Sequence, residues 1–176
     1  AEAWRGRKGE EILYLGQSVS GGLSETNGDL QKQSKLGLPP LHNPTHIAQA
    51  MGITVNELRF LAFSRRTSKT THYIRFNIPK RSGGERQISA PMPRLKDAQR
   101  WILENILARM EPHPAAHGFR KDRSIVTNAR PHLASDVVVN VDLEDFFPTV
   151  SYKRVKGLFR CLGYSEAAAT VFGLLC

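Results

Sequence analysis

Residues 73–110 read YIRFNIPKRSGGERQISAPMPRLKDAQRWILENILARM, and this stretch predicts a β-hairpin followed by a helix. In its first part Ile74, Phe76 and Ile78 alternate with polar residues, which is the period of a half-buried strand. The run SGG at 82–84 supplies a turn, and RQISA at 86–90 predicts the returning strand. From residue 94 to residue 110 the apolar residues share one stripe of an amphipathic helix: Leu95, Ala98, Ile102, Ile106 and Met110.

Two short helices are predicted before the hairpin, within residues 45–63. Gly52 suits the end of the first helix, and Thr54 followed by Glu57 fits a capping box for the second. Their expected apolar faces carry Ile47, Ala50 and Met51, and then Leu58, Leu61 and Ala62. The spacing also fits a DNA-binding helix-turn-helix. Because that pattern is short and degenerate, a structural helix pair is the favoured interpretation.

The flanking segments complete an expected α+β fold. Residues 1–43 are rich in Gly, Ser and Gln and predict a flexible lead-in or linker. A short helix is predicted over 124–133, a buried strand over 137–141, and two helices near 152–162 and 166–176. The expected organisation is therefore a lead-in at 1–43, an N-terminal helical region at 44–70 and a main domain at 71–176.

The charge balance is basic, with a net charge of +9 and an isoelectric point of about 9.9. Net charge alone is compatible with simple solubility as well as with a polyanionic partner. Its distribution favours the partner, because residues 65–100 hold ten Lys or Arg against two acids. Such a concentrated basic stretch is a plausible phosphate footprint.

Several protein classes are disfavoured by composition. No run approaches the roughly 18 apolar residues of a membrane helix, and the first residues lack the apolar stretch of a secretory signal. Cys161 and Cys176 lie in apolar helical sequence, which favours buried thiols in a reducing cytoplasm over a disulfide. The first residue is not Met, so the true start is expected to lie upstream or to have been removed.

The candidate chemistry lies in the run VVVNVDLEDFFP at 137–148. A carboxylate at the end of a buried strand is costly unless a positive group sits on it. Mg²⁺ suits that position, since it prefers oxygen ligands and often takes one or two protein carboxylates plus substrate phosphates. The alternative is that Asp142 and Asp145 only cap the following turn.

Five segments between about residue 45 and residue 176 resemble, in order and spacing, those of reverse transcriptases of the bacterial retron type. IPKRSGGERQISAP resembles the fingers segment, and LKDAQRWILENIL resembles the segment after it. AHGFRKDRSIVTNA resembles the family's GF-containing segment, and VVVNVDLEDFFPTV its first catalytic motif. NARPH at 128–132 matches the NAxxH element of retron enzymes, which is not typical of group II intron enzymes. The myxobacterial branch is the most similar.

The resemblance implies roles for particular residues. Asp142 matches the catalytic, first metal-binding aspartate, with the Leu143 carbonyl as a further Mg²⁺ ligand. Phe147 matches the steric gate beneath the sugar, while Asp145 and Phe146 would give backbone N–H groups to the triphosphate. Lys80 and Arg86 match fingers residues that hold the nucleotide phosphates. Arg120 matches a template-contacting position, and Asn128 and His132 would contact RNA. Each assignment has an alternative when the residue is taken in isolation. Lys80 and Arg86 can be solvated charges of the hairpin, and Phe147 can be a core residue. Asn128 and His132 can simply form hydrogen bonds with buried backbone groups.

The fold implied by the resemblance is a helical lead-in followed by fingers and the first part of a palm. The implied activity is RNA-directed DNA synthesis from deoxynucleoside triphosphates on a structured non-coding RNA, which yields a branched RNA-linked DNA (msDNA). A role in antiphage defence with a separate effector protein is implied too. The family's Tyr-x-Asp-Asp motif, remaining palm and thumb do not occur in these 176 residues, so the chain alone is expected to be inactive. The alternatives are a group II intron-like or diversity-generating enzyme, or a non-enzymatic RNA- or DNA-binding module.

Overall fold

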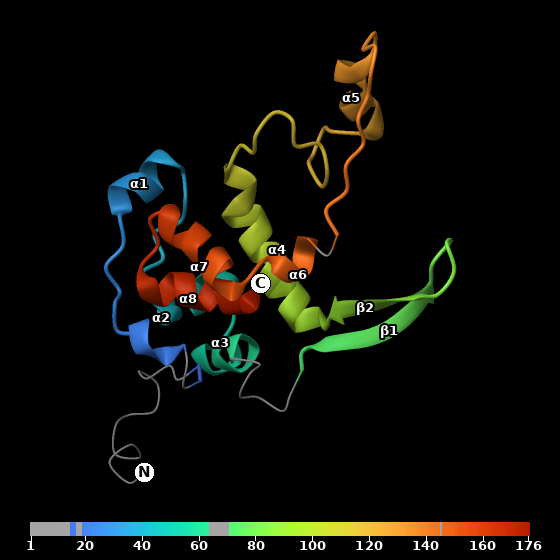
Figure 1. The fold of residues 1–176 in the computed structure, drawn as a ribbon. Helices are drawn as coiled ribbons and strands as arrows, with labels where there is room; N and C mark the ends of the chain where they lie inside the picture. The colour runs from blue at the N-terminus through green and yellow to red at the C-terminus, as the bar shows by residue number, and fades with distance from the viewer. Residues whose placement is uncertain (1–14, 17–18, 64–70, 145) are drawn as a thin grey trace, which may run out of the picture. The chain divides into compact units, whose positions relative to one another are not determined.

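The computed structural model describes residues 15–16, 19–63, 71–144 and 146–176. These residues form two compact units (Figure 1). One unit combines Ala1–Arg109 with Ser151–Cys176, and the other is Met110–Val150. Each unit is described below by itself. Among the described residues, no helix is both long enough and apolar enough to cross a membrane.

The core of the first unit is built around helix α8, Glu166–Leu175. Its sequence EAAATVFGLL is apolar nearly all round, which is the pattern of a helix buried on every side. The elements that contact it are α2 (Pro44–Met51), α3 (Val55–Ala62), α4 (Pro93–Asn105), α7 (Tyr152–Cys161) and the 3-10 turn η2 (Ser20–Gly22). Ser165 caps its start, because the Ser165 hydroxyl accepts from the backbone N–H of Ala168 at 3.1 Å. The predicted helix with its Ser165 cap is confirmed.

Helices α2, Pro44–Met51, and α3, Val55–Ala62, form the predicted helix pair. Gly52 ends α2 in the left-handed conformation with φ of 69°. The Thr54 hydroxyl accepts from the Glu57 N–H at 3.1 Å and so starts α3. The buried residues of the pair are Ile47, Ala48, Leu58, Leu61 and Ala62. The expected apolar face of α2 is thus partly wrong: Ala50 is exposed, and Ala48 takes the buried position.

Helix α7, Tyr152–Cys161, packs along α8. Gly163 ends it with φ of 95°, as the sequence predicts. The Phe159 and Phe172 rings, from α7 and α8, lie 5.0 Å apart between centroids. The expectation of buried thiols fails for Cys161, which is free and exposed. Cys176 is also free and exposed as a residue, although desolvation of its thiol raises the pKa to about 11.

The expected flexible lead-in is folded where the structure describes it. Helix α1, Leu30–Lys35, follows an Asp29 cap, and its Gln33 side chain is 1% exposed. The backbone N–H of Asp29 donates to the Gly163 carbonyl at 2.8 Å, and that of Ala167 donates to Glu25 at 3.0 Å. The expectation for 1–43 is therefore wrong over these residues. Their anchors lie more than a hundred positions away, where no local pattern can indicate them.

Strands β1, Tyr73–Pro79, and β2, Glu85–Pro91, form the predicted hairpin, with Phe76 opposite Ile88. Helix α4, Pro93–Asn105, and the 3-10 turn η3, Leu107–Arg109, follow it. Four residues of the predicted stripe are buried: Leu95, Ala98, Ile102 and Ile106. Met110, the fifth, lies beyond the end of η3 and is half-buried. The expected half-buried strand is not observed in the described part of the chain, because the sheet there has two strands and Ile74, Phe76 and Ile78 are exposed.

The second unit holds α5 (Ile125–Ala129), η4 (Arg130–His132) and α6 (Phe146–Thr149). The predicted helix near 124–133 is confirmed in part: α5 is α-helical only to Ala129 and continues as the 3-10 turn η4. Ser124 and Thr127 form a reciprocal capping box at its start. No described residue between 110 and 150 is buried. The predicted buried strand over 137–141 is wrong: these residues form no strand and are exposed. A strand needs a neighbour for its N–H and C=O groups, and no described residue pairs with this run.

Candidate functional site

The tip of the β-hairpin is a tight turn that requires glycine. The Lys80 N–H donates to the Gly84 carbonyl at 3.0 Å, and the Gly83 N–H donates back to Lys80 at 3.1 Å. Gly83 and Gly84 have φ of 88° and 78°, which a side chain would disfavour. The register places Pro79 opposite Glu85 next to this turn and Ile78 opposite Arg86 one pair further along the strands. The backbone therefore fixes Lys80 and Arg86 at one end of the hairpin.

A hollow of about 400 Å³ at this end brings the two predicted phosphate-binding residues together. It is lined by Ile78, Pro79, Lys80, Arg81, Ser82 and Arg86. The nearby Glu85 carboxylate accepts a 2.7 Å hydrogen bond from Asn77, and it does not line the hollow. The three cations of the lining, Lys80, Arg81 and Arg86, form no ion pair with any described residue. The site therefore presents three positive charges without a carboxylate, which suits a polyanion.

Arg81 is the residue that the sequence reasoning missed. It is one of the ten cations in the basic stretch, and no motif in the sequence assigns it a role. The signal that identifies it is the turn itself, because the Gly83–Gly84 pair folds residues 80–82 around one end of the hairpin. Because Arg81 lies within this five-residue turn, its side chain is placed at the same tip as Lys80.

The predicted catalytic segment lies in the other unit, between 110 and 150. Asp142 and Leu143 are exposed in irregular backbone, and Asp145 lies outside the described residues. Asp142 forms no ion pair with a described residue. Its carboxylate is therefore accessible, although the buried strand expected to carry it is not formed.

The donor chemistry of this segment suits one side of a Mg²⁺ site. A carboxylate and a neighbouring carbonyl are hard oxygen donors, which Mg²⁺ prefers. Among the described residues no group of three or more His, Cys, Asp or Glu side chains is placed to hold a metal ion. Asp142 thus fits the role of a single protein carboxylate that shares an ion with substrate oxygens.

The two phenylalanines that follow are both available at the surface. Phe147 is 76% exposed, and its ring lies 5.8 Å from the Phe146 ring in an edge-to-face arrangement. The Thr149 hydroxyl donates to the Phe146 carbonyl at 2.6 Å and tightens the short helix α6. Within the described chain Phe147 is therefore not a core residue, and its ring is free to contact another molecule.

The three predicted RNA-contacting residues also lie in the second unit. Asn128 is in α5 and His132 is in η4, and both are exposed. The helix type changes at Arg130, so the two are not on one continuous α-helix as expected. The Arg120 guanidinium lies 3.5 and 3.4 Å from the carbonyls of Pro112 and Ala116, so it is turned toward its own loop.

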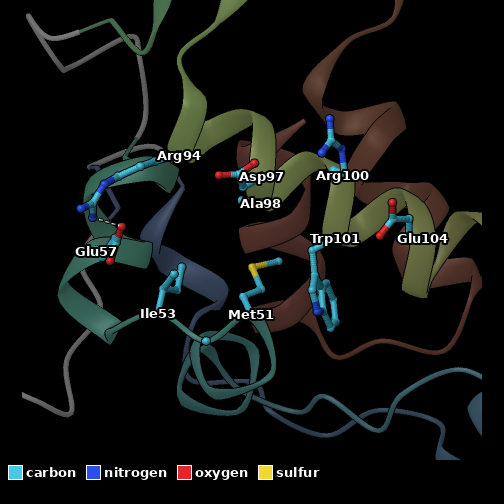
Figure 2. Close-up of a pocket in the computed structure, with 10 residues that line it drawn as sticks. Met51, Ile53, Glu57, Arg94, Asp97, Ala98, Arg100, Trp101 and Glu104 are labelled. Atoms are coloured by element: carbon cyan, nitrogen blue, oxygen red, sulfur yellow. Dashed lines mark hydrogen bonds and ion pairs between the residues drawn. The ribbon is translucent and has the colours of Figure 1, made fainter.

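A second hollow, of about 550 Å³, lies where the α2–α3 turn meets α4. Trp101 extends from α4 beside Met51, and Arg94 pairs with Glu57 across the gap (Figure 2). The lining mixes Arg94 and Arg100 with Glu57, Asp97 and Glu104, so it does not favour a polyanion. Helix α3 itself carries one basic residue, Arg59. These features favour a structural helix pair over a DNA reader.

Comparison with known proteins gives one consistent family of relatives, although no family model matches the chain. The retron Mx162 reverse transcriptase of Myxococcus xanthus is 50% identical over 139 residues, 79% of this chain. The retron Mx65 reverse transcriptase of the same organism is 40% identical over 84% of the chain. The retron Ec86 reverse transcriptase of Escherichia coli is 35% identical over 80%. The chain spans 29%, 34% and 43% of the lengths of these relatives.

Proposed function

Because this chain belongs, over about four fifths of its residues, to the retron reverse transcriptases, we propose that it supplies the fingers and the first catalytic segment of an RNA-directed DNA polymerase. The observation that carries the proposal is the 50% identity over 139 residues to a named retron reverse transcriptase. A second palm segment with the Tyr-x-Asp-Asp motif and a thumb would complete the enzyme.

The hairpin tip supports the nucleotide-binding part of the proposal. Polymerisation is phosphoryl transfer, in which positioning and charge neutralisation supply most of the catalysis. Lys80, Arg81 and Arg86 line one hollow that has no carboxylate in it. We infer that they hold the triphosphate of the incoming deoxynucleotide, with the planar guanidinium of Arg86 donating to two oxygens at once.

The catalytic segment supports the proposal through its accessible groups. Asp142 and the Leu143 carbonyl would hold one side of a Mg²⁺ ion, which when bound would neutralise charge on the phosphates. The exposed Phe147 ring would lie under the sugar and exclude a 2′-hydroxyl by contact. Backbone N–H groups of Asp145 and Phe146 would donate to the triphosphate.

The template and the product of the proposed enzyme are those of a retron. We propose that the enzyme copies a structured non-coding RNA and stays with a branched RNA-linked DNA, the msDNA. Asn128 and His132, exposed on consecutive turns, would contact that RNA, since both side chains can donate and accept hydrogen bonds. An antiphage role with a separate effector protein belongs to the same proposal.

The nucleic acid that purifies with the complete enzyme tests this function. The expected result is one RNA species joined covalently to single-stranded DNA. Ribonuclease alone and deoxyribonuclease alone should each shorten this joined molecule. Recovery of intron RNA, or of complementary DNA without a branch, would favour a group II intron-like or diversity-generating enzyme. RNA without any DNA, together with no primer extension, would leave only a binding module.

A further inference from the structure

Helix α7 and the turn η2 enclose a third hollow, of about 430 Å³, which has no part in the function proposed above. Three cations from α7 line it: Lys153, Lys156 and Arg160. At positions i, i+3 and i+7 they share one face of the helix. Helix α7 itself, YKRVKGLFRC, contains no acidic residue. The face is thus a row of positive charge about two turns long.

One carboxylate in this hollow organises two of the cations. Glu166, at the start of α8, pairs with Lys156 and lies 3.5 Å from the Nε of Arg160. Lys153 is exposed and forms no ion pair with any described residue. Three cations against one carboxylate leave an excess of positive charge, and two of the three side chains are held in place by the same acid.

Two glycines that line the hollow, Gly22 and Gly157, differ in whether the surrounding structure has room for a side chain. A Cβ on Gly22 would clash with Cγ of Glu166, so a side chain there would displace the carboxylate that pairs with Lys156. A Cβ on Gly157, in the middle of α7, would meet nothing within 4 Å. Glycine in a helix interior is less stable than alanine. Packing within the described chain therefore does not explain the glycine at position 157, which lies beside Lys153 and Lys156 on the basic face.

We propose that this face binds the phosphodiester backbone of the structured RNA, with a phosphate seated over Gly157 and held by Lys153 and Arg160. The inference rests on the proposed function for the identity of its partner. A row of cations along one helix matches successive phosphates of a chain, and a missing side chain lets that backbone approach closely. The site lies on α7, a different element from the hairpin tip that would take the nucleotide.

The complete enzyme, freed of its own nucleic acid, is the material for the test. Binding of a fluorescein-labelled RNA hairpin is measured by anisotropy over a series of salt concentrations, with a DNA duplex of equal length as a second arm. The variants are Lys153→Gln and Gly157→Ala. The matched control is Lys35→Gln, which removes the same charge from an exposed lysine on α1 that lies outside the basic stretch 65–100 and does not line the hollow.

Lys153→Gln should weaken RNA binding about fivefold to tenfold at moderate salt and reduce the slope of log affinity against log salt by about 1. Gly157→Ala should raise the melting temperature and yet weaken RNA binding. Lys35→Gln should change neither slope nor affinity. RNA affinity and slope that stay at the wild-type values in both test variants would overturn the proposal, as would an equal loss in the control.

Comparing the RNA hairpin with the DNA duplex identifies the nucleic acid that binds α7, and an activity assay tests the proposed polymerase function independently. Loss restricted to the DNA duplex would contradict RNA as the occupant. Extension of a short annealed primer on an unrelated template should survive in both variants. If the wild-type enzyme did not extend a primer at all, the proposed polymerase function would fail, while the RNA-binding loss on α7 would still stand or fall by the anisotropy measurement.

Discussion

The side-chain amide of Gln33 donates a 2.9 Å hydrogen bond to the carbonyl oxygen of Gly163, 130 positions later in the chain. The same carbonyl accepts the backbone N–H of Asp29 at 2.8 Å. These bonds attach the α1 segment to the end of α7. The position also forbids a side chain, because a Cβ on Gly163 would lie 2.9 Å from the Asp29 carbonyl oxygen.

Gln33→Ala should lower the free energy of unfolding by about 1–3 kcal/mol, because it removes a buried hydrogen bond and leaves a cavity. Thermal unfolding followed by circular dichroism measures the change, at about 2–4 °C per kcal/mol for a chain of this size. The control is Gln31→Ala, an exposed residue of the same helix. An equal effect of both substitutions would contradict the role of the Gln33–Gly163 bond.

Asp142→Asn should reduce DNA synthesis by the complete enzyme by several orders of magnitude. The amide keeps the shape of the side chain but loses the charge that would hold Mg²⁺. Primer extension under single-turnover conditions measures the loss, and Asp136→Asn makes the same change at another exposed aspartate of the segment. Near-normal extension by the Asp142 variant would remove this residue from the metal site.

Lys80→Gln and Arg86→Gln should each lower kcat/KM for deoxynucleotides by about tenfold or more, since a hydrogen bond to a charged group contributes about 1.5–3 kcal/mol. Arg81→Gln should have an effect of the same sign. Steady-state kinetics at varied nucleotide concentration gives the values. Arg75→Gln, on the same hairpin but outside the hollow, is the matched control. If all four variants behaved alike, the hollow would not be the triphosphate site.

Phe147→Ala should admit ribonucleotides, because it removes the ring that we propose excludes a 2′-hydroxyl. The readout is the ratio of kcat/KM for a deoxynucleotide to that for the matching ribonucleotide. Phe146→Ala is the natural control, since only the backbone of Phe146 is assigned a role. A ratio that does not move in the Phe147 variant would show that the ring is not a gate.

A double variant of Asn128 and His132 tests whether these residues recognise the cognate RNA, as proposed for a retron enzyme. Changing both to Ala should weaken binding and self-primed synthesis on the cognate RNA, while extension of an ordinary annealed primer should persist. Both residues are exposed, so the double variant should keep its melting temperature. Equal loss on both templates would mean that the segment supports the fold and does not recognise the RNA.

The elements that could be predicted from the sequence are those with signals inside a few residues. Gly52, Thr54 and Ser165 mark helix ends through their own backbone or hydroxyl groups, and the structure places them as expected. The hairpin follows from alternation around the Gly83–Gly84 turn. Lys80 and Arg86 come together for the same local reason.

The segments that the sequence predicts wrongly share one property: their structure depends on residues far away in the chain. Gln33 is polar and lies in a Gly- and Ser-rich stretch, so only its bond to Gly163 explains why it is buried. The β-branched run at 137–141 has the composition of a strand, but no described neighbour pairs with it. The placement of Asp142 relative to the hairpin depends on such partners as well, and it stays a prediction.

Helix α8 has a consequence for the order of events during synthesis. Elements from residues 20–62 and from α4 bury their apolar faces against it, yet it comes last among them in the chain. Contacts between such distant segments require closure of long loops, which slows folding. We expect the emerging helices to wait with exposed apolar faces until residues 166–175 leave the ribosome. That interval is when aggregation or capture by chaperones competes with folding.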